Sequence, residues 1–160
     1  MNIKILISGD GGQGIQLIAD MITQTAFNDD WFVTSIPNYG LEQRGGVSLN
    51  FIQISDKKIV YPKFSGADIL LVMSHQAEER VEGYKNTECR ILNIEDFREK
   101  LKENNINVKS YNIFFLGLIV KKLEEQNILK ADDIFKMLEK KLGTKPGWEE
   151  NKKAFEFGTL

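Results

Sequence analysis

The chain contains little cysteine, and neither sign of charge is in excess. Cys89 is the only cysteine among 160 residues, which excludes an intrachain disulfide and a four-cysteine iron–sulfur site held by this chain alone. The 21 basic and 23 acidic residues give a net charge of -2, so no strong field favours nucleic acid or an anionic membrane. The first apolar run, residues 3–7, is too short to span a bilayer, and no signal-peptide pattern follows it. We therefore expect a cytoplasmic protein.

The composition is that of an ordinary folded protein, with 42% hydrophobic and 28% charged residues. The length predicts a single domain over residues 1–160, large enough for a well-formed core. Strand-like and helix-like segments alternate along the chain. This alternation predicts an α/β fold, with a mostly parallel, twisted, Rossmann-like sheet, helices on both faces and one antiparallel hairpin.

Hydrophobic periodicity and breaker residues set the expected elements. The expected strands are 3–7, 32–36, 67–73, 90–94 and a weak one at 106–109. A hairpin is expected between residues 47–54 and 59–62, with a turn at 55–58. The expected helices start at Ile15, Gln76, after Asp96, at an Asn112 cap, at Asp132 and at Glu149.

A glycine-rich turn lies between the first strand and the first helix. Residues 9–14 read Gly-Asp-Gly-Gly-Gln-Gly and match the G-x-G-x-x-G spacing in the strand–turn–helix context that gives this motif its meaning. Glycines allow a tight turn and a close approach of a ligand, and the helix start offers free N–H groups to an anion. Three readings follow: dinucleotide binding, nucleotide hydrolysis, or a turn that only packs the strand against the helix.

Two of these readings lack a residue that they need. A dinucleotide site requires an acid at the end of the second strand, where Ile36 is followed by Pro37 and Asn38. A P-loop requires a lysine and a hydroxyl directly after the last glycine, where Ile15 and Gln16 stand instead. The packing turn stays open as an alternative.

A second motif, at residues 39–48, reads Tyr-Gly-Leu-Glu-Gln-Arg-Gly-Gly-Val-Ser and has no periodicity. Together with the glycine turn it resembles the γ subunit or domain of the 2-oxoacid:ferredoxin (acceptor) oxidoreductases, of the pyruvate, 2-oxoglutarate or indolepyruvate type. That family shows a G-x-G-G-Q-G-I turn and a Y-G-x-E-x-R-G-G loop. Further counterparts are a proline after a hairpin, an Ala-Asp strand start, and an asparagine before Leu-Gly, here Pro62, Ala67-Asp68 and Asn112 with Leu116-Gly117. Leu41 and Gln43 depart from the residues common in the family loop.

The resemblance implies a subunit of a complex that decarboxylates a 2-oxoacid oxidatively and forms an acyl-CoA. Thiamine diphosphate, Mg and [4Fe-4S] clusters would be held by partner chains, namely α and β (thiamine-binding) and ferredoxin-like δ subunits. Ferredoxin or a similar acceptor would take the electrons. This chain would hold no cofactor alone, would be inactive alone, and would help form the coenzyme A side of the site. An autonomous Rossmann-type nucleotide-binding or interaction module is the alternative.

The candidate site residues belong to the two motifs: Gly11, Gly12, Gln13, Gly14, Tyr39, Glu42, Arg44, Gly45 and Gly46. Arg44 offers a planar fork for a carboxylate or phosphate, although Glu42 can also pair with it merely to stiffen the loop. Gln13 suits a ligand or, equally, the backbone of its own turn. Tyr39 can supply a hydroxyl or an interface anchor. His75 follows a strand end but is expected to be a surface residue, and Cys89 has no partner histidine to make it a nucleophile.

Overall fold

The computed structural model describes residues 1–39 and 45–160, and the expected Glu42 and Arg44 lie outside the described residues. Its contacts divide the chain into two compact units, Met1–Asp96 and Phe97–Leu160, and each is described by itself. The expectation of a single domain over residues 1–160 stays a prediction. Within the described residues, no helix has the length and apolarity needed to cross a membrane.

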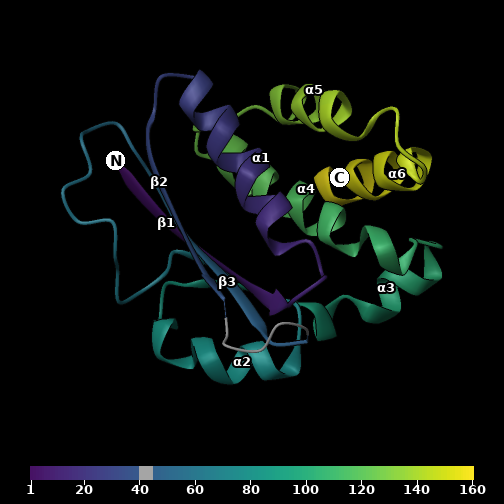
Figure 1. Ribbon diagram of the computed structural model, residues 1–160, viewed down its shortest axis with the longest axis horizontal. Coiled ribbons are helices and arrows are strands. Elements are labelled where there is room, and N and C mark those ends of the chain that lie inside the picture. The colour runs from purple at the N-terminus through teal and green to yellow at the C-terminus, as the bar shows by residue number, and fades with distance from the viewer. Residues whose placement is uncertain (40–44) are drawn as a thin grey trace. The chain divides into compact units, whose positions relative to one another are not determined.

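The first unit is built on a five-stranded sheet. Its strands are β1 (Asn2–Asp10), β2 (Phe32–Tyr39), β3 (Val47–Ser55), β4 (Ile69–Val72) and β5 (Arg90–Asn93). The strand order is β2-β3-β1-β4-β5; β4 is parallel to β1 and to β5, whereas β3 is antiparallel to β1 and to β2. All strands except β3 therefore run in one direction. β1, β2 and β3 lie side by side in Figure 1. The predicted α/β fold with a mostly parallel sheet is confirmed.

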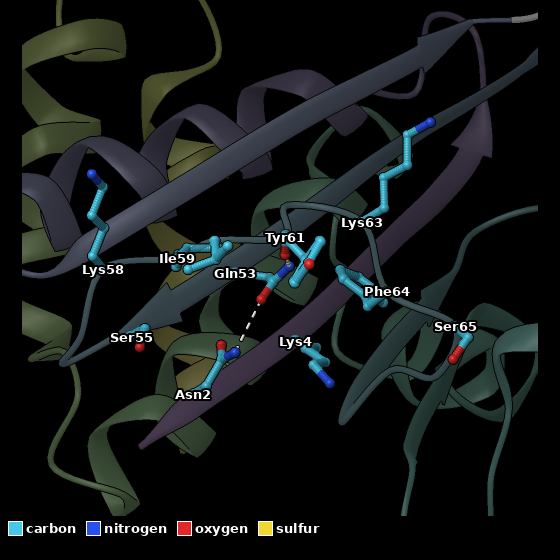
Figure 2. A pocket seen from close by; sticks show the side chains of 11 residues that line it. Asn2, Lys4, Gln53, Ser55, Lys58, Ile59, Tyr61, Lys63, Phe64 and Ser65 are labelled. Atoms are coloured by element: carbon cyan, nitrogen blue, oxygen red, sulfur yellow. Dashed lines mark hydrogen bonds between the residues drawn. The ribbon is translucent and has the colours of Figure 1, made fainter.

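One strand of the predicted antiparallel hairpin, residues 47–54, is confirmed as β3, but its predicted partner is wrong. β3 pairs with β2, and residues 59–62 form no strand. Instead, residues 59–62 belong to an irregular segment between β3 and β4. A hydrogen bond from the Gln53 Nε2 to the carbonyl of Tyr61, over 2.8 Å, attaches this segment to β3 (Figure 2). The prediction was wrong because Val60 and Tyr61 are solvent-exposed. The strand propensity of a β-branched and an aromatic residue therefore does not indicate burial in a sheet here. Pro37 lies within β2 because an edge strand tolerates a proline.

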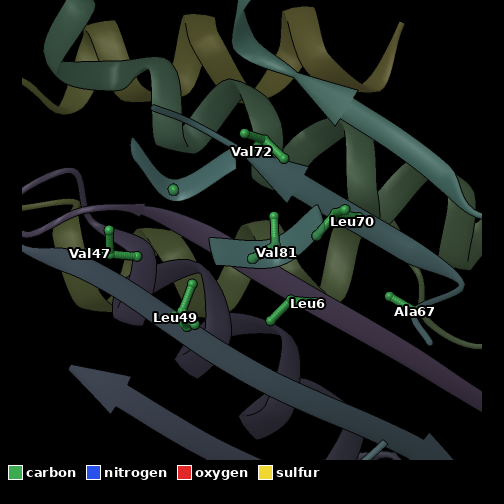
Figure 3. Close-up of a cluster of buried hydrophobic side chains, with 8 residues drawn as sticks. Leu6, Val47, Leu49, Ala67, Leu70, Val72 and Val81 are labelled. Atoms are coloured by element: carbon green, nitrogen blue, oxygen red, sulfur yellow. The ribbon is translucent and has the colours of Figure 1, made fainter. Parts of the chain in front are cut away.

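Two helices cover opposite faces of this sheet. Alternate residues of β3 point to opposite sides: Asn50 contacts Gln16 of α1 (Ile15–Asn28), whereas Val47 and Leu49 pack with Ala77 and Val81 of α2 (His75–Val81). Figure 3 shows the second of these layers, in which Leu6, Leu70 and Val72 from β1 and β4 join the same cluster. A 3-10 turn (Glu82–Tyr84) follows α2, and another (Ile94–Asp96) follows β5.

The second unit is helical, with α3 (Arg98–Glu103), α4 (Tyr111–Glu125), α5 (Ala131–Leu142) and α6 (Trp148–Thr159). Gly117 of α4 and Gly158 of α6 bring the two backbones together, because a Cβ on Gly158 would collide with the carbonyl of Phe114. The expected strand at 106–109 is absent, and a 3-10 turn (Val108–Ser110) stands there. The Asn107 side chain accepts from the Lys109 N–H at 2.9 Å, a local bond that competes with strand pairing.

The cap of the long helix lies two residues before the position that we predicted. Ser110, not Asn112, occupies the N-cap position of α4, and Asn112 lies buried in its first turn. The Ser110 hydroxyl donates to the Asn151 Oδ1 of α6 over 2.7 Å. The asparagine of α6 thus helps to hold the start of α4.

Candidate functional site at the glycine edge

The glycine turn and the second motif meet at one edge of the sheet. β1 ends at Asp10, opposite the first residue of β3, Val47. The turn after β1 and the last residues of the loop before β3 are therefore neighbours, and the Gly11 N–H donates to the carbonyl of Gly46 over 2.7 Å. We call this carboxyl-terminal edge of β1, with residues 11–14, 45 and 46, the glycine edge. The structure thus brings the glycine parts of both predicted motifs together.

The backbone of the glycine edge adopts conformations that favour glycine. The φ angles of Gly12, Gly14 and Gly45 are 92°, 76° and 72°, in the region that other residues rarely occupy. A Cβ on Gly12 or Gly45 would meet no atom within 4 Å. These two glycines are therefore required for conformation rather than for packing within the described residues, and their backbone is open to another molecule.

Gln13 points into the protein rather than towards solvent. Its Oε1 accepts from the backbone N–H of Asp10 at 2.7 Å, and its Nε2 donates to the carbonyl of Met73 at 3.1 Å. The side chain therefore links the ends of β1 and β4. Of the two readings of Gln13, the contacts favour the one in which it satisfies the turn's own backbone.

Gln76 contacts the glycine edge, and the sequence motifs did not predict it. It stands in the first turn of α2, where its Nε2 donates to Asp10 Oδ1 and to the carbonyl of Gly45, the latter over 2.7 Å. The Ser74 hydroxyl caps the same helix by accepting from the Ala77 N–H at 3.1 Å. Gln76 follows shortly after β4 (Ile69–Val72), and this position indicates a site residue only once β4 is known to end at the same edge as β1. His75, beside it, is exposed, in keeping with the surface role expected for it.

A partly buried polar network lies beneath the start of α1, and the sequence motifs did not predict it. The Gln16 Nε2 donates to Ser48 Oγ at 3.0 Å and to the carbonyl of Leu49 at 3.1 Å, and its Oε1 accepts from the Asn50 Nδ2 at 2.8 Å. The Ser35 hydroxyl of β2 donates to Asn50 Oδ1 at 3.0 Å. The sequence did contain one indication of this network, because Ser48 and Asn50 alternate with apolar residues in β3. The network fixes the first turn of α1 against β3 and β2.

Charge and exposure distinguish the remaining groups at this edge. Tyr39 ends β2 with 64% of its surface exposed. α1 begins after Gly14 with no acidic residue in its first turn, so the positive end of its dipole is not neutralised there. The nearest carboxylate in sequence, Asp10, is engaged by Gln76. The edge therefore offers backbone N–H groups and an aromatic face.

Cys89 lies away from the glycine edge, directly before β5 and half-buried against the cluster of Figure 3. Burial raises the pKa of the Cys89 thiol, and Asp68 adds to the effect. A thiol held neutral is a poor nucleophile. Among residues 1–39 and 45–160, no three His, Cys, Asp or Glu side chains are grouped to hold a metal ion.

The geometry defines an α/β protein whose glycine turn is closed by a second loop of the same chain. It differs from a dinucleotide-binding fold, because the strand beside β1 is the antiparallel β3, and β2, whose end would carry the ribose-binding acid, is one strand further out. The family model described as pyruvate ferredoxin/flavodoxin oxidoreductase matches residues 4–93. The chain belongs to this family.

Relatives and solved structures agree with this assignment. The chain is 42% identical over 78 residues to the 2-oxoglutarate synthase subunit KorC of Methanothermobacter marburgensis, a match that covers 48% of this chain and 42% of that protein. Across three KorC proteins, the matched part spans 40 to 62% of the relative's length. The fold is similar to that of a keto/oxoacid ferredoxin oxidoreductase γ subunit from Geobacter sulfurreducens (TM-score 0.72, 20% identity, 98% of this chain and 96% of that one). It is also similar to a 2-oxoglutarate:ferredoxin oxidoreductase from Magnetococcus marinus (TM-score 0.79, 17% identity, 98% of this chain and 30% of that one).

Proposed function

We propose that this chain is the γ-type subunit of a 2-oxoacid:ferredoxin (acceptor) oxidoreductase complex that converts a 2-oxoacid and coenzyme A into carbon dioxide and an acyl-CoA. The observation that carries the proposal is the contact between Gly11 and Gly46, which unites both motifs of the family resemblance at one edge. The family match over residues 4–93 and the KorC relatives support it. The Magnetococcus enzyme, whose structure has 2-oxoglutarate, coenzyme A and succinyl-CoA bound, has a part that resembles this chain in fold.

The chemistry of the complex belongs to partner chains. Thiamine diphosphate with Mg would supply the carbanion chemistry on α and β subunits, and [4Fe-4S] clusters on a ferredoxin-like δ subunit would pass electrons to ferredoxin or a similar acceptor. A [4Fe-4S] cluster needs four cysteine thiolates, and this chain has one cysteine. The clusters would therefore be bound by another subunit. We place the complex in the cytoplasm.

The role of this chain is to shape the coenzyme A side of the site through the glycine edge. The open backbone at Gly12 and Gly45 and the acid-free start of α1 suit a phosphate or another chain's backbone. Arg44 and Glu42 would extend from the same loop, and Tyr39 would supply an aromatic contact. Gln13 and Gln76 act as positioning residues, because each holds the turn rather than facing out of it.

Reconstitution tests the proposal. The chain is co-expressed with its genomic thiamine-binding and ferredoxin-like partners, and reduction of a viologen dye is followed with each 2-oxoacid, with and without coenzyme A. We expect coenzyme A-dependent turnover only when this chain is present, and neither turnover nor visible iron–sulfur absorbance from the chain alone. Full turnover without this chain, or turnover by the isolated chain, contradicts the proposal.

A further inference from the structure

A cavity lies at the opposite ends of the strands that form the glycine edge. It measures about 580 Å³ and lies between the amino-terminal part of β1, the end of β3 and the irregular segment 56–68 (Figure 2). The two ends of a nine-residue strand such as β1 are about 25 Å apart. The cavity is therefore separate from the glycine edge, and the proposed function assigns it no role.

The floor of this cavity is polar and buried. Gln53, only 2% exposed, accepts at Oε1 from the Asn2 Nδ2 at 3.0 Å and donates from Nε2 to the carbonyl of Tyr61 at 2.8 Å (Figure 2). An amide nitrogen carries two N–H groups, and among the described residues only Tyr61 accepts from it. Ser55, also buried, lies beside it on β3. One N–H of Gln53 is thus available to a ligand that reaches the floor.

The rim of the cavity is positively charged. Lys58 and Lys63 stand at either end of the stretch that covers Gln53, and Lys4 stands on β1 (Figure 2). None of the described residues that line the cavity is acidic. Asp56, next to it in sequence, is paired with the Met1 ammonium at 2.8 Å. Three cations therefore border one cavity of a chain whose net charge is -2.

The walls between these charges are apolar. Ile59, Val60 and Phe64 line the cavity beside Tyr61. A cavity of several hundred Å³ with apolar walls and a few polar groups is the usual form of a small-molecule site. A flat protein surface would contact the exposed rim but would not reach Gln53, so the buried floor favours a small ligand over a docked protein.

From this geometry we propose that the cavity binds a small molecule carrying a phosphate or diphosphate group. The lysine ammonium groups suit phosphate as point charges. The Gln53 amide donates to the ligand from the floor, and an apolar or ring portion of the ligand packs on Ile59 and Val60. The proposal goes beyond the proposed function and does not depend on it, because it needs no partner subunit.

An NMR titration of the full chain with pyrophosphate tests the proposal. At constant ionic strength, we expect saturable shifts at the amides of Gln53 and of residues 58–61 and 63–65, and none at residues 11–14. The triple variant Lys4→Gln/Lys58→Gln/Lys63→Gln should weaken pyrophosphate binding by about tenfold, because three charge contacts with the ligand are removed. The matched control Lys136→Gln/Lys140→Gln/Lys145→Gln, with equal charge change on exposed residues of the second unit, should bind within about twofold of the parent chain.

Three results would overturn the proposal. The first is the absence of saturable shifts at these amides, and the second is an equal loss of affinity in both triple variants. The third is binding of poly-glutamate, but not of pyrophosphate, at residues 58–65, which would make the rim a docking surface for an acidic protein. Unchanged shifts elsewhere in the spectrum of the first triple variant show that its fold is intact.

Discussion

The N–H of Gly11 donates to the carbonyl of Gly46 over 2.7 Å, which joins two motifs that lie far apart in the sequence. Gln76 reinforces the junction by donating to the carbonyl of Gly45 from a third segment. The glycine turn is therefore held in place by its own chain before any ligand or partner arrives. This preorganisation is the property expected of a subunit that completes a site built mainly by others.

Gln13→Leu should destabilise the chain. Leucine has a size similar to glutamine but can make neither of the two hydrogen bonds of the Gln13 side chain. The Asp10 N–H loses its acceptor and the carbonyl of Met73 loses its donor, at a cost of about 1–3 kcal/mol in the free energy of unfolding. Urea denaturation of the two chains measures the difference. Gln24→Leu, at an exposed position of α1, is the control, with a change within about 0.5 kcal/mol. A Gln13→Leu value as small as the control's would mean that the turn does not need this side chain.

Arg44→Ala should lower the activity of the assembled complex without altering the fold. Losing one charge-assisted contact to a carboxylate or phosphate would reduce kcat/KM by about tenfold or more, and Arg44→Lys should recover little, because the planar fork is lost. The control is Arg80→Ala, an exposed arginine of α2. Turnover and coenzyme A dependence equal to the parent complex would reject Arg44 as a site residue.

Local pattern was sufficient to predict much of the fold. The β-branched run before the glycines and the helical spacing after Ile15 predicted β1, the turn and α1, since neighbours in sequence determine these elements. The hairpin was misplaced because strand pairing depends on distant segments. Residues 59–62 have the composition of a strand, yet β2 pairs with β3, and no local signal ranks these two partners.

The sequence identified the two motifs that meet at the glycine edge, but it did not indicate the direction of each side chain. The glycine spacing located the turn, whereas the inward orientation of Gln13 depends on the carbonyl of Met73 at the end of β4. Gln76 could be found only by knowing that β4 lies beside β1. Residues that position a site through such long-range contacts leave no spacing in the sequence to recognise.

Gly158→Ala should destabilise the helical unit strongly. The added methyl group would collide with the carbonyl of Phe114 and press on Gly117, and overpacking of this kind costs about 1–3 kcal/mol or more. The melting temperature should fall accordingly. Gly83→Ala is the matched control, because a Cβ there meets no atom within 4 Å. Equal melting temperatures for the two variants would show that α4 and α6 adjust without cost.

Cys89 should react slowly with iodoacetamide in the folded chain. Burial raises the pKa of its thiol, so the reactive thiolate forms only above the ordinary midpoint of about 8.5. Because the chain has one cysteine, the pH dependence of the alkylation rate reports this group alone. The same chain in guanidinium chloride is the control and should show the ordinary midpoint. A folded-state midpoint at or below that of the unfolded chain would contradict the burial argument.

Gln16 and Asn50 should prove energetically coupled. Asn50→Leu leaves the partly buried Gln16 Oε1 and the exposed Ser35 hydroxyl without their partner. Because solvent reaches both groups in part, the expected cost is that of an ordinary hydrogen bond, about 0.5–1.5 kcal/mol. Gln16→Leu should lower the free energy of unfolding by a similar amount, because the Asn50 Nδ2 loses its acceptor.

Replacing both residues removes donor and acceptor together, so the double variant should be less destabilised than the sum of the single variants by about 0.5–3 kcal/mol. The free energies of unfolding of the four chains, from urea denaturation, give this coupling directly. Lys136→Gln, in the second unit, paired with Asn50→Leu is the control and should be additive within about 0.5 kcal/mol. Additivity of Gln16→Leu with Asn50→Leu would mean that the hydrogen bond between them does not hold the start of α1, and the glycine edge would need another support.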